Sequence, residues 1–254
     1  MLEGAYRIGL GLIVAMGLMA FATTIRAPNG YGRYLGDKLA GTIAARPGWL
    51  IFEAPQWMAF ALTFWFTARA ININTATLLL LGLWQAHYLY RGLGMPFRMR
   101  IGSKRLPIAT IWFGLPFNAL NGFVNGYAVG HAEHLASASW LGDPRFIAGL
   151  AIAGVGWVIN VHSDNLLFRL RKPGETGYRV PYGGMFRFVS SANYLGEIML
   201  WIGWAVMTWT AAGLIFALFT IANLGPRALS HHKWYRATFA DYPPERRALI
   251  PFIL

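Results

Sequence analysis

The chain has 254 residues, of which 56% are hydrophobic and only 13% are charged, and its formal net charge is +12 at pH 7. Soluble domains are about a quarter charged, so this composition excludes an ordinary soluble domain and indicates several passes through a membrane. The sequence contains no cysteine, which excludes disulfides, thiol catalysis and cysteine metal sites.

The first apolar segment covers residues 7–24. Arg7 before it and the small residues Ala20 and Ala22 near its end would suit a secretion signal. The apolar run is longer than the core of a usual signal peptide, so we expect a helix that is retained in the protein.

Six further apolar segments follow, at residues 50–70, 75–93, 108–130, 146–168, 193–208 and 210–226. Together with the first they predict seven transmembrane helices, and hence an all-α integral membrane protein formed by a single domain over residues 1–254. The last two segments share one apolar stretch, which only a weak break at Thr210 to Gly213 divides. A fold with six spans therefore remains an alternative.

The positive charges lie in alternate loops. Nearly all of the 22 lysines and arginines follow the first, third and fifth spans or occupy the C-terminal tail, and the exceptions are Arg7, Arg69 and Arg145. Cytoplasmic loops are enriched in these residues, so the pattern predicts the N-terminus outside and the C-terminus in the cytoplasm. A basic soluble protein would suggest nucleic acid. Here we expect no nucleic-acid partner, but four basic loops on one face that suit a polyanionic ligand.

Ionisable side chains inside a membrane span are costly, and they are therefore candidates for function. Glu53, Asp164 and Glu197 lie in predicted spans, where a structural ion pair is the alternative for each. Tyr88 lies deeper in the third span than an interfacial aromatic residue would. Three asparagines share one face of the fourth span, where they either bridge helices or line a cavity: Asn118, Asn121 and Asn125.

Neither a metal centre nor a phosphate-binding loop is predicted. The six histidines fall on both sides of the predicted membrane, so they form no common metal cluster. Because no glycine-rich nucleotide motif is present, a nucleotide would have to bind through arginines and polar side chains of several loops. Tyr178, Trp201 and Tyr235 offer aromatic faces for stacking.

The chain from Asn160 onward carries six specific strings: HSD at 162–164, LRKPGE at 170–175, GYRVPYGG at 177–184, ANYLGEI at 192–198, HHKWY at 231–235 and DYPPERRALIPFIL at 241–254. By these strings the sequence closely resembles the steroid 5α-reductase family, the 3-oxo-5α-steroid 4-dehydrogenases, with a bacterial-type homologue expected. The N-terminal half matches it more thinly, at GYGR (30–33), EAP (53–55), HY (87–88) and NGFVNGY (121–127). Over residues 94–107 the family pattern is not clear.

The resemblance implies a seven-helix enzyme that transfers hydride from NADPH to C5 of a 3-oxo-Δ4 steroid and gives a 5α-steroid. It implies that Glu53 and Tyr88 polarise the 3-ketone. Phe52 stands where the family has a glutamine, and Gln56 follows one helical turn later. Residues 1–130 would mainly form the substrate cavity and residues 145–254 the cofactor site.

Two sets of residues follow from the resemblance. The substrate-binding set is Trp49, Glu53, Gln56 and Tyr88. The cofactor-binding set is Arg33, Lys104, Arg105, Asn160, Asp164, Arg171, Tyr178, Arg179, Asn193, Glu197, His231 and Tyr235. We expect a monomer in the bacterial inner membrane, or in the endoplasmic reticulum if the source is eukaryotic. A steroid or other apolar enone would enter from the bilayer lipid.

Three other functions remain open. An enoyl-thioester or polyprenol reductase is the nearest. A membrane methyltransferase using S-adenosylmethionine shares C-terminal features but has no use for a pair of residues that binds a ketone. A transporter or a lipid-binding protein without catalysis belongs to a different class. Transporters typically show repeats or paired broken helices, and the sequence has none.

Overall fold

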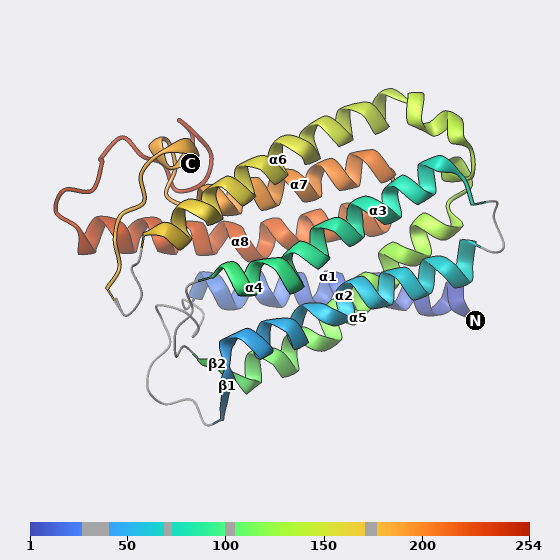
Figure 1. The fold of residues 1–254 in the computed structure, drawn as a ribbon, viewed down its shortest axis with the longest axis horizontal. Helices are drawn as coiled ribbons and strands as arrows, with labels where there is room; N and C mark the ends of the chain where they lie inside the picture. Colours follow the sequence, from blue (N-terminus) through green and yellow to red (C-terminus); the bar gives the residue numbers. More distant parts are fainter. Residues whose placement is uncertain (27–40, 69–72, 100–104, 171–176) are drawn as a thin grey trace.

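The long helices lie alongside one another in an elongated bundle (Figure 1). In this computed structural model the described residues are 1–26, 41–68, 73–99, 105–170 and 177–254. The long helices are α1 (Leu2–Arg26), α2 (Ala45–Ala68), α3 (Thr75–Leu89), α5 (Ile108–His131), α6 (Pro144–Arg169), α7 (Ala192–Thr208) and α8 (Ala211–Thr238). The short elements are the π-helix η2 (Tyr90–Gly94), α4 (Met95–Arg98), the 3-10 helices η3 (Glu133–Ala136), η4 (Ala138–Gly142) and η5 (Gly184–Arg187), and the strands β1 (Thr42–Ala44) and β2 (Arg105–Pro107).

Each predicted apolar segment overlaps one long helix, so the helical architecture is confirmed. The last apolar stretch forms two helices. Trp209 takes a left-handed conformation with φ 50°, which ends α7. Thr210 then caps α8 by accepting a hydrogen bond from the Gly213 N–H. Among the described residues, α1, α6 and α8 are long and apolar enough to cross a membrane. The chain is therefore an all-α membrane protein.

Several boundaries differ from the prediction. Helix α2 begins at Ala45 and runs through Pro55 without a break. The predicted third span is not one α-helix, because a π-helical turn follows Leu89. Helix α8 continues to Thr238, so part of the expected tail is helical. Strands β1 and β2 form a short antiparallel ladder in two loops, which apolar periodicity alone does not reveal.

Glycines bring two pairs of helices into backbone contact. A Cβ atom added to Gly156 of α6 would lie 2.5 Å from the Leu200 nitrogen of α7, and one added to Gly203 would lie 2.3 Å from the Ala153 nitrogen. Helices α2 and α5 meet in the same way at Gly126, where a Cβ would lie 2.5 Å from the Phe60 oxygen. Small residues allow such approach in membrane proteins. The two tight pairs therefore fix the positions of the polar side chains that α2, α6 and α7 carry.

An aromatic core fills the space between these pairs. Trp84 of α3 is 1% exposed, and its ring centroid lies 4.5 Å from Phe60 of α2 and 4.9 Å from Trp204 of α7. Tyr88 lies one turn further along α3, with its ring 5.0 Å from that of Trp84. The aromatic core therefore extends along α3 to Tyr88, beside the buried charged side chains that α2 and α7 carry.

Candidate active site

Arg91 joins two buried carboxylates from distant parts of the chain. Its Nε atom lies 3.5 Å from Glu53 Oε1, and its Nη1 atom lies 3.1 Å from Glu197 Oε2. The side chains of Glu53 and Glu197 are only 4% and 13% exposed. A charge in such a place needs a partner, and one guanidinium serves both carboxylates. The result is an acid–arginine–acid cluster linking α2, η2 and α7.

The π-helical turn η2 places Arg91 in this cluster. Single π-helical turns are uncommon and often occur at functional sites. The turn contains Gly92, where an added Cβ would lie 3.3 Å from the Glu53 Cβ. Glycine at this position thus allows the end of the third span to approach α2.

Glu197 is held by further contacts from three helices. Its Oε2 accepts a hydrogen bond from the Asn160 amide at 3.0 Å, and its Oε1 accepts one from the Trp201 indole at 2.9 Å. His87 Nε2 lies 3.7 Å from Oε1. Asn160 also donates to the Asn193 carbonyl oxygen at 3.0 Å. This carboxylate is therefore fixed in position by α3, α6 and α7.

Tyr88 borders the same cluster and is 5% exposed. Its ring stacks on Trp201 with centroids 5.6 Å apart and an interplanar angle of 26°, and the His87 ring meets it edge-on at 4.9 Å. Arg91 interacts electrostatically with Tyr88 as well as with Glu53 and Glu197. The structure thus places Tyr88 against His87 and Trp201, two residues that also contact Glu197 of the cluster.

Of the predicted substrate residues, Gln56 is the most unusual. Its side chain is fully buried, and neither amide atom has a hydrogen-bond partner among the described residues. Trp49 lies in the second turn of α2, with its ring 5.6 Å from Phe52. The Phe52 carbonyl oxygen accepts a hydrogen bond from Asn118 at 2.6 Å. An unpaired buried amide is costly, which makes Gln56 a candidate for contact with a ligand.

The predicted cofactor residues divide into an inner and an outer group. The inner group lies where α6 faces α7: Asn160, Asp164, Asn193 and Glu197. Asn160 and Asp164 are 4% and 8% exposed, and Asn193 forms a side-chain hydrogen bond with Asp164. These four residues bring carboxylate and amide groups close to Arg91.

The outer group lies beyond α6 and along the end of α8. Tyr178 is exposed, with its ring 5.4 Å from Trp234, and Arg179 is exposed beside it. The His231 ring is 5.5 Å from that of Tyr194.

Tyr235 is 4% exposed and stacks on Tyr242 at 5.4 Å, so its ring packs in a small core. Arg105 of β2 donates to both the hydroxyl and the carbonyl oxygen of Thr42, at 2.6 and 2.7 Å. Arg33, Lys104 and Arg171 lie outside the described residues.

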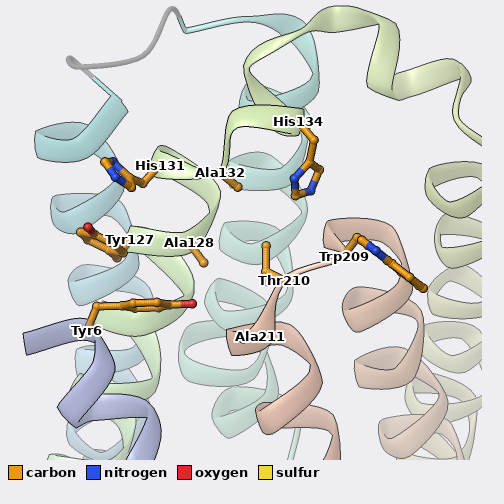
Figure 2. A pocket seen from close by; sticks show the side chains of 9 residues that line it. All are labelled: Tyr6, Tyr127, Ala128, His131, Ala132, His134, Trp209, Thr210 and Ala211. Carbon is orange, nitrogen blue, oxygen red and sulfur yellow. The ribbon is translucent and has the colours of Figure 1, made fainter. Parts of the chain in front are cut away.

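A separate pocket of about 240 Å³ lies at the other end of the helices (Figure 2). Tyr6 of α1, Tyr127 and His131 of α5, and Trp209 and Thr210 between α7 and α8 line it. It contains none of the predicted site residues, so it is not the predicted steroid site.

Arg91 and His87 are missing from the predicted site. In the sequence, Arg91 lies at the end of an apolar segment and belongs to the positive charges that are expected to orient the chain in the membrane. Its spacing carries a usable signal, since Arg91 follows Tyr88 by three residues and His87 by four, so all three share one helical face. The partner carboxylate Glu197 is far away in sequence, and spacing cannot reveal that contact.

A charged cluster enclosed by apolar helices, with aromatic rings beside it and an unpaired amide nearby, is the combination expected of an integral membrane protein that binds a small molecule. A family model described as 3-oxo-5-alpha-steroid 4-dehydrogenase matches residues 104–254, more than half of the chain. The chain belongs to this family.

Individual relatives match nearly the whole chain. The chain is 40% identical over 247 residues to 3-oxo-5-alpha-steroid 4-dehydrogenase 1 of Rattus norvegicus, covering 96% of this chain and 94% of the relative. The identity to 3-oxo-5-alpha-steroid 4-dehydrogenase 2 of Homo sapiens is 39% over 249 residues, covering 96% and 95%. The match therefore includes α2 and α3, which carry Glu53 and Tyr88, as well as the C-terminal strings.

Proposed function

We propose that this protein reduces the C4–C5 double bond of 3-oxo-Δ4 steroids to 5α-steroids with NADPH as the hydride donor. Family membership supports the reaction class. The observation that carries the proposal is the Arg91 bridge, because it joins Glu53, one of the two expected ketone residues, to Glu197 among the expected cofactor residues. A reductase needs these two sites side by side.

The substrate side of the site would stabilise charge on the 3-ketone oxygen. Addition of hydride at C5 moves an electron pair through C4 to that oxygen, and a proton then adds at C4. The Tyr88 phenol donates a hydrogen bond to the oxygen, and the Glu53 carboxyl, when it carries a proton, donates a second. One such preorganised donor contributes about 3 kcal/mol to lowering the barrier.

Gln56 and Trp49 would complete the substrate side. The Gln56 amide has a donor and an acceptor that no described residue satisfies. A polar group on the steroid skeleton is a suitable partner, while Trp49 and Phe52 provide apolar surface near the start of α2. Gln56 would thereby supply polar recognition in a chain that has Phe52 where the family has a glutamine.

The inner cofactor group fits the nicotinamide end of NADPH, which supplies the hydride when bound. Asn160 and Asn193 offer amide donors and acceptors, and Asp164 and Glu197 offer acceptors, which are suitable partners for a carboxamide. The outer group would hold the rest of the dinucleotide. Arg179, Arg105, Arg33, Lys104 and Arg171 suit phosphates. Tyr178 and His231 would contact the dinucleotide beside them, and Tyr235 would act through the core that it forms with Tyr242.

We further propose that all seven long helices cross the membrane, with the N-terminus outside and the C-terminus in the cytoplasm. The steroid enters from the bilayer, and the cofactor enters from the cytoplasm. Residues 1–130 would mainly serve the steroid and residues 145–254 the cofactor. The positions of Glu53 and Tyr88 on α2 and α3, and of Asn160 and Glu197 on α6 and α7, support this division. The protein would act as a monomer in the bacterial inner membrane or the endoplasmic reticulum.

A substrate panel tests the proposal. Purified protein in lipid nanodiscs is given NADPH or NADH with testosterone, progesterone, a polyprenol, or an enoyl thioester, and the products are identified by mass spectrometry against standards. We expect 5α-reduced steroids with NADPH as the preferred donor. Turnover of only the polyprenol or the thioester would establish one of the alternative reductases, and no product from any steroid would refute the proposal.

A further inference from the structure

The last residues of the chain expose an apolar surface beside exposed arginines. Phe252 and Ile253 are 77% and 78% exposed, and Ile250 and Leu254 are 41% and 45% exposed. We call these four residues the C-terminal tip. Exposed apolar side chains that occur singly are normal in proteins, but four neighbouring ones outside any helix call for a partner.

The tip projects from a segment that is firmly attached to the bundle. The Arg247 N–H donates to the Phe188 carbonyl oxygen at 2.9 Å, and the Ser190 N–H donates to the Arg247 oxygen at 2.8 Å. Ala248 and Leu249, just before the tip, are 3% and 6% exposed. The segment is thus anchored beside the beginning of α7, and the tip is not a loose tail.

The final turn holds the tip side chains outward. The Leu254 oxygen at the chain terminus accepts hydrogen bonds from the N–H groups of Leu249 and Ile250, both at 2.7 Å. Phe252 takes a left-handed conformation with φ 65°, which is unfavourable for an aromatic residue. Its ring lies 5.6 Å from that of Phe188, which is itself 39% exposed. The turn therefore keeps a strained backbone conformation at Phe252 while its apolar side chains remain exposed.

The tip lies near the end of the bundle at which, in the proposed topology, α6 leaves the membrane. Figure 1 shows the C-terminus beside the last turns of α6, well short of the far end of α8. Exposed basic residues flank the tip, since Arg187 and Arg247 occupy the two segments that the backbone hydrogen bonds join. Apolar side chains with arginines at their base are the composition of segments that lie in the interface of a bilayer.

We propose that the C-terminal tip inserts into the interfacial layer of the adjacent leaflet and that Arg187 and Arg247 bind the phosphates of anionic lipids there. Each arginine near an anionic surface favours association by about fivefold. A second copy of the chain is a poorer partner, because symmetric pairing of two tips would bring their flanking arginines toward each other. The tip would hold the end of the cofactor-binding part at a fixed depth beside α7.

The absence of cysteine from the chain permits a direct test. Ile253→Cys is labelled with an environment-sensitive fluorophore in the full-length protein and studied in nanodiscs of phosphatidylcholine with phosphatidylglycerol. Glu245→Cys is the matched control, because Glu245 is exposed in the same segment but lies outside the tip. We expect blue-shifted emission at position 253, with stronger quenching by lipids spin-labelled near the headgroup than by lipids labelled at the chain end. The control should show neither effect.

A second variant tests the choice of lipid. The double substitution Arg187→Gln and Arg247→Gln in the labelled Ile253→Cys protein should remove the additional quenching that anionic lipid produces and leave quenching in pure phosphatidylcholine nearly unchanged. Water-like emission at position 253 in both lipid mixtures would overturn the proposal. Emission that depends on protein concentration rather than on lipid would assign the tip to contact between copies instead. Circular dichroism of each variant shows whether its helices are retained.

Discussion

Arg91 Nη1 lies 3.1 Å from Glu197 Oε2, so the end of the third apolar segment is tied to the beginning of the sixth across 106 residues of sequence. The same guanidinium also lies 3.5 Å from Glu53 Oε1. Any steroid held by Glu53 and any cofactor held by Glu197 would therefore be positioned through one side chain. This bridge is the structural basis for treating the two half-sites as one active site.

Removal of the Arg91 charge should damage both the fold and the reaction. Arg91→Met leaves two buried carboxylates without a cation, which costs about 3 kcal/mol. We expect a lower thermal midpoint and a turnover number reduced by more than the loss of folded protein explains. Arg98→Met is the control, because Arg98 pairs with Tyr90 and Asn165 at an exposed position. Equal effects of the two substitutions would remove Arg91 from its bridging role.

The Tyr88 hydroxyl should matter for the chemical step and little for cofactor affinity. Tyr88→Phe keeps the aromatic packing against Trp84 and Trp201 but removes the donor, so kcat should fall by about a hundredfold. The dissociation constant for NADPH, measured by fluorescence titration, should stay nearly unchanged. Tyr90→Phe serves as the control, since the Tyr90 hydroxyl is bonded to Arg98. A loss that appears only in cofactor affinity would contradict the assigned role.

Replacement of Gln56 should stabilise the fold and weaken steroid binding. Its unpaired amide weakens the fold by about 1–3 kcal/mol if no ligand is present. Gln56→Met should consequently raise the thermal midpoint and also raise KM for the steroid, by about tenfold if one hydrogen bond is lost. Gln85→Met is the comparison, because Gln85 donates to the Trp57 carbonyl oxygen at 3.1 Å. That variant should lose stability and keep its KM. An unchanged steroid KM in Gln56→Met would exclude contact with the substrate.

Two glycines of α6, two residues apart, should respond oppositely to alanine. A Cβ at Gly156 would lie 2.5 Å from the Leu200 nitrogen, whereas a Cβ at Gly154 meets no atom within 4 Å. Gly156→Ala should destabilise the protein by about 1–3 kcal/mol through overpacking. Gly154→Ala should be neutral or stabilising by up to about 1 kcal/mol, because alanine favours helix. Thermal unfolding followed by tryptophan fluorescence measures both, and similar midpoints for the two variants would contradict the α6–α7 contact.

Sequence alone predicts the helices well because each long apolar run can satisfy its backbone only as a helix in a membrane. The break at Thr210 is correctly located, since the threonine caps the following helix. The length of α8 is missed because its last three turns are more polar, and apolar content does not show where a helix with a polar end stops. The β1–β2 ladder is missed because its register pairs Thr42 with Pro107, a contact between two loops.

The site could be predicted only in part. Glu53, Asp164 and Glu197 are identifiable because a charge in an apolar span is rare. Arg91 lies at the end of an apolar span, where its spacing from His87 and Tyr88 is a signal, but its contacts with two carboxylates are visible only in the fold. For Tyr235 the sequence misleads, because it places the residue in an open tail, whereas the structure buries its ring against Tyr242. Contacts across more than a hundred residues depend on helix packing, and the sequence carries no local signal of them.

We propose above all that this chain transfers hydride from the nicotinamide to C5 of a steroid enone. The most direct test is turnover of testosterone with NADPH deuterated at C4 of the nicotinamide, using both stereoisomers of the label in separate reactions. We expect one stereoisomer to give a 5α-reduced product with deuterium at C5 and the other to give the same product without it. Deuterium at another carbon, a 5β product, or an intact C4–C5 double bond would contradict the account.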